Sequence, residues 1–80
     1  MKQRRIMLPT IEDARKFVAA AERCDFDIDV FYNRVVIDAK SLLGVMSLDL
    51  TKVLTVEYNG ENKDFENFLD EMSRKTSTAA

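Results

Sequence analysis

Residues 26–32 alternate between apolar and mostly acidic side chains, which is the period of a β-strand with one face in water. Asn33 and Arg34 follow, and asparagine tolerates the positive φ that a two-residue turn requires. Residues 35–38 then return as a short apolar strand. The stretch DFDIDVFYNRVVIDA therefore predicts a β-hairpin, with which the other elements of the chain must be compatible.

The residues before this hairpin predict a strand and then a helix. Residues 4–8 form a short apolar run with a basic flank, ended by Pro9, which suits a strand at or near the edge of a sheet. Thr10 offers an oxygen to the free amides of a helix start, and the carboxylate of Asp13 can reach back toward the same amides. Apolar residues then recur at helical spacing: Ile11, Ala14, Phe17, Val18, Ala21 and Cys24.

The residues after the hairpin predict a short helix, a strand and a last helix. Ser41 precedes the apolar stretch 42–46, and residues 54–58 alternate again as a strand. A helix should begin at Asp64, because apolar residues follow it at helical spacing and basic residues come at its end, as the helix dipole prefers. These residues are Phe65, Phe68, Leu69 and Met72, followed by Arg74 and Lys75.

The order of predicted elements is strand, helix, strand, strand, short helix, strand, helix. Eighty residues form a single domain with one small core, and such a chain buries only about 60% of its unfolded surface. The economical arrangement is an α+β fold in which one antiparallel sheet carries the helices on one face. We expect residues 3–74 to form the folded unit and residues 75–80 to be an unstructured tail of the 1–80 domain.

The composition indicates a cytoplasmic globular protein. Hydrophobic residues make up 46% and charged residues 32%, and no apolar run approaches the roughly 20 residues that span a bilayer. The basic start at Lys2, Arg4 and Arg5 has no signal-peptide core after it. The single cysteine, Cys24, has no partner for an internal disulfide, and we expect it to be a buried apolar residue.

Several kinds of chemistry are excluded by what the sequence lacks. There is no histidine, which excludes triads with a histidine base and histidine phosphotransfer, and two glycines make no phosphate-binding loop. The series Asp25, Asp27 and Asp29 resembles the opening of a calcium loop, but the sixth position is Val30 rather than glycine and the twelfth is Val36 rather than glutamate. We expect no metal and no cofactor.

Ser41 precedes the apolar segment 42–46. As a helix cap, its hydroxyl can accept a hydrogen bond from the free amide of Leu43 or Gly44. The same amides would also hold a phosphate on Ser41. The four apolar side chains of the segment, Leu42, Leu43, Val45 and Met46, cannot all face inward on one short helix. Some of them must be exposed, as a docking patch requires.

The segment VIDAKSLLGVMSL, residues 36–48, resembles the central region of HPr, the histidine-containing phosphocarrier protein of the bacterial sugar phosphotransferase system. The resemblance implies the HPr open-faced β-sandwich, a four-stranded antiparallel sheet with three helices on one face in the order βαββαβα. It also implies that Ser41 is a regulatory phosphorylation site for the HPr serine kinase of Gram-positive bacteria. Leu42, Leu43 and Met46 map onto the contact surface for the family's protein partners, among them transcriptional regulators.

The departure from the family lies at the start of the first helix. HPr proteins carry their phosphocarrier histidine there, whereas counting back from Ser41 places Thr10 at that position, and matching the following residues places Asp13 there instead. A threonine phosphate ester is too stable to pass its phosphoryl group on. An aspartyl phosphate usually requires magnesium, and no second carboxylate cluster is evident.

We therefore expect a non-catalytic regulatory or protein-binding member of the HPr family, docking through the helix after Ser41. The first alternative is a stoichiometric phosphocarrier that uses Thr10 or Asp13 in place of histidine. The second is a small nucleic-acid-binding domain using an exposed Phe31 and a basic spot formed by the four residues Lys2, Arg4, Arg5 and Arg15. The acidic pI of about 5.0 counts against this one. A membrane partner is not expected.

Overall fold

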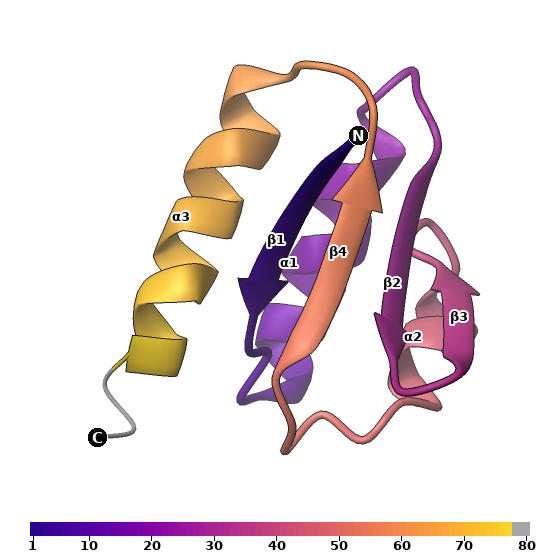
Figure 1. Cartoon of the computed structure of the whole chain (residues 1–80), viewed down its shortest axis with the longest axis vertical. Helices are drawn as coiled ribbons and strands as arrows, with labels where there is room; N and C mark the ends of the chain where they lie inside the picture. The colour runs from indigo at the N-terminus through magenta and orange to yellow at the C-terminus, as the bar shows by residue number, and fades with distance from the viewer. Residues whose placement is uncertain (78–80) are drawn as a thin grey trace.

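The computed structural model describes residues 1–77, and its elements follow the predicted order βαββαβα (Figure 1). The elements are β1 (Lys2–Ile6), α1 (Ile11–Glu22), β2 (Ile28–Tyr32), β3 (Val35–Asp38), α2 (Leu42–Met46), β4 (Leu54–Tyr58) and α3 (Lys63–Ser77). Asn33 adopts φ 55° in the turn between β2 and β3, as the hairpin prediction requires.

All four strands form one antiparallel sheet in the order β1-β4-β2-β3. The last strand in sequence, β4, lies between β1 and β2, so that Val56 is paired with Arg4 on one side and Val30 on the other. β1 and β3 are the two edge strands. The predicted edge position of the first strand is thus confirmed.

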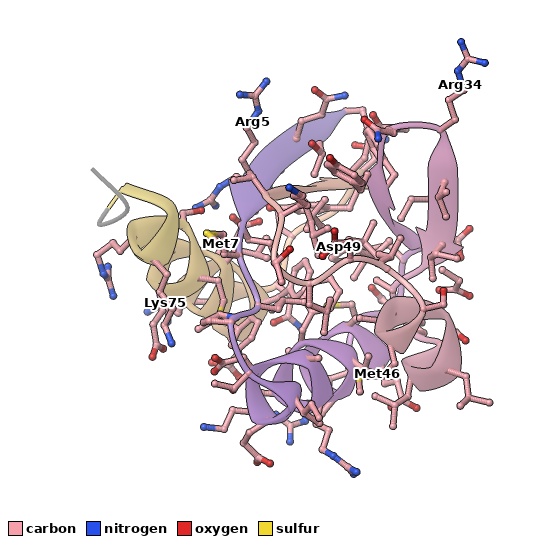
Figure 2. The ribbon with its side chains drawn as sticks, turned by 90° about the horizontal axis from the view of Figure 1, so that it is seen from below. Arg5, Met7, Arg34, Met46, Asp49 and Lys75 are labelled. Carbon is pink, nitrogen blue, oxygen red and sulfur yellow. The ribbon has the colours of Figure 1, made fainter. Side chains whose placement is uncertain are left out.

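Three helices cover one face of the sheet and leave the other face open. Figure 2, seen from below, shows the curved sheet with α1, α2 and α3 on one side, while Arg5 and Arg34 project on the other. Strand residues alternate accordingly, since Ile28 and Val30 are buried while Asp29 between them is exposed. This is the open-faced β-sandwich predicted from the resemblance.

The core lies between the sheet and α1 and α3. Its aromatic centre consists of Phe17, Phe65 and Tyr58, with the Tyr58 and Phe65 ring centroids 5.3 Å apart in an edge-on arrangement. Cys24 is only 4% exposed, so its predicted burial is confirmed. Ile11, however, is 58% exposed, because the first residue of α1 lies beyond the end of the buried stripe.

Several element boundaries differ from the sequence predictions, among them the start of β2, which is Ile28 rather than Phe26. β1 begins at Lys2 rather than Arg4 and ends at Ile6 rather than Leu8, because its ladder with β4 pairs residues 2–6. The last helix begins at Lys63, because the side chain of Asn62 accepts a hydrogen bond from the Phe65 amide at 3.0 Å and caps the helix one residue earlier than expected.

The last helix also continues past the predicted end of the folded unit. α3 runs to Ser77, so residues 75–77 are helical, and the ammonium group of Lys75 contacts Asp13 on α1. The remainder of the predicted tail, residues 78–80, lies outside the described residues. Within residues 1–77, no helix combines the length and the apolar character needed to cross a bilayer.

Candidate functional site

Ser41 is the N-cap of α2. Its backbone is extended, its side-chain Oγ accepts a hydrogen bond from the Gly44 amide at 3.2 Å, and its carbonyl accepts one from Val45 at 2.9 Å. The residue is exposed. The capping role that the sequence predicted is therefore present, and the hydroxyl remains open to solvent.

The apolar side chains of α2 divide between the core and the solvent, as predicted. Val45 is fully buried and Leu42 is half-buried against the core, whereas Leu43 is 86% exposed and Met46 is 36% exposed. Met46 lies between the ribbons of α1 and α2 in Figure 2, consistent with the packing of these two helices. We call the exposed residues Ser41, Leu43 and Met46 the α2 surface.

Gly44 allows α2 to lie directly against β3. A Cβ atom at this position would come within 2.6 Å of Ile37 Cγ2, closer than real side chains approach, and within 3.1 Å of the Ser41 Oγ. The loop before the helix is also held in place, because the Lys40 ammonium donates a hydrogen bond to the Cys24 carbonyl at 3.0 Å. The α2 surface is thus held against β3 and against the residues that follow α1.

Thr10 caps α1 in the same way that Ser41 caps α2. Its Oγ1 accepts a hydrogen bond from the Asp13 amide at 3.0 Å, and its carbonyl accepts one from Ala14 at 3.1 Å. Thr10 is exposed. The helices that these two residues cap pack together. However, β3 leads into α2 and runs antiparallel to β2, and Lys40 just before Ser41 contacts the Cys24 carbonyl after the end of α1, so Ser41 lies nearer to the end of α1 than to its start.

Asp13 does not use its carboxylate as the sequence predicted. The side chain was expected to reach back to the backbone amides at the start of the helix, but its Oδ2 lies 3.5 Å from the Lys75 ammonium instead. Asp13 is 8% exposed and is the one buried charged residue among those the structure describes. Its carboxylate is thus part of the contact between α1 and α3.

The predicted basic spot is not brought together. Successive residues of a strand point to opposite faces, so Arg4 lies on the helix side and Arg5 on the open side. The Arg4 guanidinium is 3.0 Å from Glu66 and also contacts Asp70, and the Lys2 ammonium is 3.4 Å from Glu66. Two of the four basic residues are therefore neutralised by α3.

Phe31 is half-buried rather than fully exposed. It lines a shallow hollow on the open face together with Asp29, Asn33, Val36 and Glu57. The two carboxylates beside the ring would repel a phosphate backbone. The sequence prediction of an exposed aromatic for stacking bases is not supported by this environment.

Potential metal ligands and the single thiol are the remaining candidates for a reactive site in the described residues. In the part of the chain that the structure describes, no three His, Cys, Asp or Glu residues converge on a common point. Burial raises the pKa of the Cys24 thiol, whose Sγ lies 3.5 Å from the Ala20 carbonyl oxygen. A reactive thiolate is therefore disfavoured at this position.

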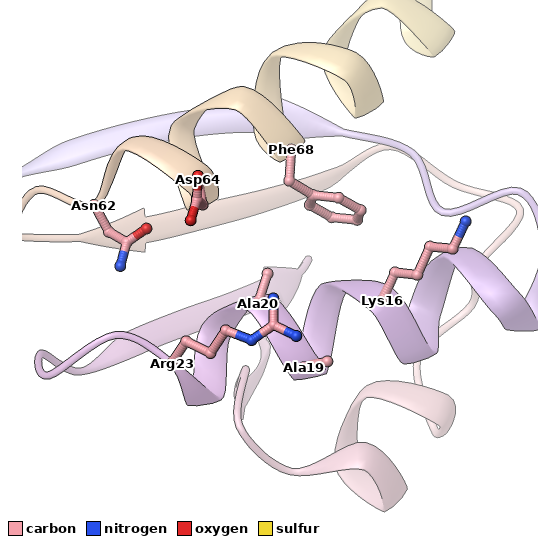
Figure 3. Close-up of a pocket in the computed structure, with 7 residues that line it drawn as sticks. All are labelled: Lys16, Ala19, Ala20, Arg23, Asn62, Asp64 and Phe68. Carbon is pink, nitrogen blue, oxygen red and sulfur yellow. The ribbon is translucent and has the colours of Figure 1, made fainter.

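A groove between α1 and α3 was not predicted from the sequence. It has a volume of about 300 Å³, and Figure 3 shows Lys16 of α1 and Arg23, the C-cap of that helix, at its two ends, with Phe68 of α3 pointing toward α1. None of the predicted site residues lines it. The signal available in the sequence was the spacing of the two basic residues, seven positions apart on one face of α1.

The comparisons with known proteins agree with this architecture. Residues 12–76 match the family model described as the PTS HPr component phosphorylation site, a match that includes Asp13 and Ser41 and leaves out Thr10. The fold is similar to the crystal structure of HPr-C-His from Thermoanaerobacter tengcongensis, with 23% sequence identity, a TM-score of 0.74 and coverage of 92% of each chain.

A second solved structure gives the same result at slightly higher identity. The phosphocarrier protein HPr from Bacillus anthracis str. Ames is 26% identical, with a TM-score of 0.64 and coverage of 91% of this chain and 93% of its own. The family match spans most of the sequence, and the element order, sheet and helical layer are those expected from the resemblance. The chain therefore belongs to the HPr family.

Proposed function

We propose that this HPr-family protein is a regulatory or protein-binding module that does not carry phosphate to sugar transporters. It docks onto protein partners through the α2 surface, and phosphorylation of Ser41 switches that docking. The observation that carries the proposal is the exposure of Leu43, an 86% exposed leucine two residues after an exposed capping serine. As a phosphotransferase-system protein of this kind, it acts in the cytoplasm.

The loss of the carrier role is supported by the residues near the start of α1. The chain contains no histidine, and the two residues that could stand in its place, Thr10 and Asp13, are both occupied by structural contacts. Asp13 is in addition buried, which leaves little room for a phosphoryl donor to approach. A phosphorylated threonine would not transfer its group onward.

The switch is supported by the position of the Ser41 hydroxyl. A phosphate adds about 1.5 to 2 negative charges and three acceptor oxygens, here next to the exposed Leu43 and Met46. A partner that binds the apolar side chains alone would lose affinity, whereas a partner with arginines placed opposite the phosphate would gain it. The partners we propose are the HPr serine kinase itself and a transcriptional regulator.

The test is the intact mass of the protein after two separate incubations. One contains phosphoenolpyruvate and the first enzyme of the phosphotransferase system, and the other contains ATP and the HPr serine kinase. We expect one phosphate from the kinase and none from phosphoenolpyruvate. Ser41→Asn is the matched control, because asparagine keeps the helix cap but cannot be phosphorylated.

The docking surface is tested by the rate of the same kinase reaction. We expect Leu43→Asp to lower kcat/KM about tenfold, the effect of losing roughly 1.4 kcal/mol at one interface residue. Val53→Asp is the control, because Val53 is a 43% exposed valine outside α2. Phosphate from phosphoenolpyruvate would instead support the carrier alternative through Thr10 or Asp13.

A further inference from the structure

The edge strand β3 exposes apolar side chains. Its one neighbour in the sheet is β2, and the side chains of Val35 and Val36 are 51% and 60% exposed. An edge strand also presents a row of backbone N–H and C=O groups that have no partner in the sheet. These two properties together favour the addition of another strand.

The opposite edge of the sheet is protected in a way that β3 is not. β1 carries Lys2, Arg4 and Arg5 within five residues, and charged side chains on an edge strand hinder strand addition. β3 has the sequence Val-Val-Ile-Asp and is preceded by Arg34. A positive charge therefore lies just before the strand and a negative charge at its last residue. This charge pattern allows the strand to pair with a second copy of itself.

The backbone of β3 shows which of its residues face outward. The Ala39 amide bonds the Ile28 carbonyl of β2 at 2.9 Å, and hydrogen-bonding residues alternate along an antiparallel strand. Val35 and Ile37 therefore also direct their backbone groups toward β2. Val36, between them, directs its N–H and C=O away from the sheet, and it can bond a further strand.

One antiparallel register satisfies both the backbone and the charges. When Val36 lies opposite the partner's Val36, their outward backbone groups can bond each other, and Arg34 lies opposite the partner's Asp38 on the same face. Symmetry creates this Arg-to-Asp pair twice. Shifting the register so that Ile37 lies opposite the partner's Ile37 would place Arg34 opposite the partner's Lys40, which is repulsive.

The two charged residues are available for such pairing. Arg34 projects away from the body of the protein in Figure 2, and the structure gives it no ion pair within residues 1–77. Asp38 uses one carboxylate oxygen to accept the Lys40 amide at 2.9 Å, and its other oxygen is open. Both side chains belong to the open face, on which Val36 is also exposed.

We propose that β3 is a self-association edge, through which two copies of this chain join their sheets in the register with Val36 opposite the partner's Val36. The inference goes beyond the proposed function, because it concerns the sheet edge and not the α2 surface, and it stands whether or not Ser41 is phosphorylated. The strand is short, so the association is concentration-dependent rather than permanent.

Sedimentation velocity over a wide range of protein concentration tests the proposal. We expect a monomer–dimer equilibrium, weakened about tenfold by Arg34→Asp because each dimer would then contain two repulsive pairs. Asp38→Arg should weaken it similarly. An equal mixture of the two variants should dimerise again, since one variant then carries carboxylates at both positions and the other carries guanidinium groups.

Arg5→Asp is the matched control, because it makes the same charge change at an exposed arginine on the other edge strand. It should leave the equilibrium unchanged, and circular dichroism of every variant checks that the fold is kept. The proposal is overturned if the wild-type protein stays monomeric at all concentrations. It is also overturned if a dimer forms but Arg34→Asp and Asp38→Arg leave it unaffected, or if their mixture fails to associate.

Discussion

The carboxylate of Asp13 lies 3.5 Å from the ammonium group of Lys75, so that an ion pair joins the first turn of α1 to the last turns of α3. The Asp13 side chain is 12% exposed and that of Lys75 is 39% exposed. The contact holds the end of the last helix against the start of the first one. It also occupies one of the two residues that could have replaced a phosphocarrier histidine.

Replacing Lys75 by methionine should therefore lower the stability of the protein. We expect a loss of about 0.5 to 1 kcal/mol in the free energy of unfolding, the range of a partly exposed ion pair. Urea denaturation measures it, and added salt should reduce the difference from the wild type. Lys16→Met on α1 is the control, and an equal loss there would mean that the effect comes from general charge rather than from this pair.

Ser41 should contribute to stability through its cap, independently of any phosphorylation. Ser41→Ala removes the oxygen that accepts the Gly44 amide, and it should cost about 1 kcal/mol. Ser41→Asn should restore most of that loss, because asparagine is an equally good cap. If both variants are as stable as the wild type, α2 is held by its packing alone.

Gly44 should resist replacement although it lies inside a helix. Alanine is intrinsically favoured over glycine in helices by about 1 kcal/mol, but here its Cβ would lie 2.6 Å from Ile37 Cγ2. That methyl group sits on a stiff β-branched stem, so relief requires a shift of backbone, and overpacking costs about 1 to 3 kcal/mol. We expect Gly44→Ala to be destabilising on balance.

A double variant separates the helix preference of alanine from its steric clash with Ile37. Ile37→Ala removes the obstructing methyl, and in that background Gly44→Ala should become neutral or stabilising. Thermal or urea unfolding of the four proteins in this cycle gives the coupling energy directly. Additive effects would show that α2 and β3 are not in close contact at this point.

Local patterns predicted most of the elements of this fold. The alternation in residues 26–32 and the Asn33 turn predict the hairpin, and Ser41 and Thr10 are predictable as caps because capping acts within three residues. The cap of α3 was missed, since Asn62 lies next to two other polar residues, Glu61 and Lys63, that gave no distinct start signal.

Contacts between distant parts of the chain were not predictable in the same way. The sequence places Arg4 in a surface basic spot, but in the structure it pairs with Glu66 and Asp70 because β1 lies beside α3 in space. Similarly, no local feature distinguishes the buried Asp13 from an exposed helix-start aspartate. The partial exposure of α2 follows from the number of its apolar residues, but the sequence does not show that Leu43 is the most exposed of them.

The hydroxyl of Tyr58 donates a hydrogen bond to Glu66, beneath the contact of Lys2 and Arg4 with the same carboxylate. Burial raises the pKa of the Tyr58 phenol well above its usual value near 10, and the hydrogen bond to Glu66 and its negative charge act in the same direction. The nearby Arg4 opposes this shift only in part. Folding therefore favours the protonated phenol.

This raised pKa predicts a loss of stability at alkaline pH. The contribution of the Tyr58 phenol to the free energy of unfolding is fully present below about pH 10, where the phenol of the unfolded state is still protonated. Above that pH the unfolded state releases the proton, and the contribution falls by up to about 1.4 kcal/mol per pH unit. Urea unfolding of the wild type and of Tyr58→Phe, at neutral pH and on both sides of pH 10, isolates the effect, because other alkaline titrations are common to both proteins. The prediction is contradicted if the free energies of unfolding of the wild type and of Tyr58→Phe decline in parallel above pH 10. As an independent check, Tyr32→Phe leaves Tyr58 as the sole tyrosine, so the tyrosinate absorbance of this variant should develop only well above pH 10 or on unfolding.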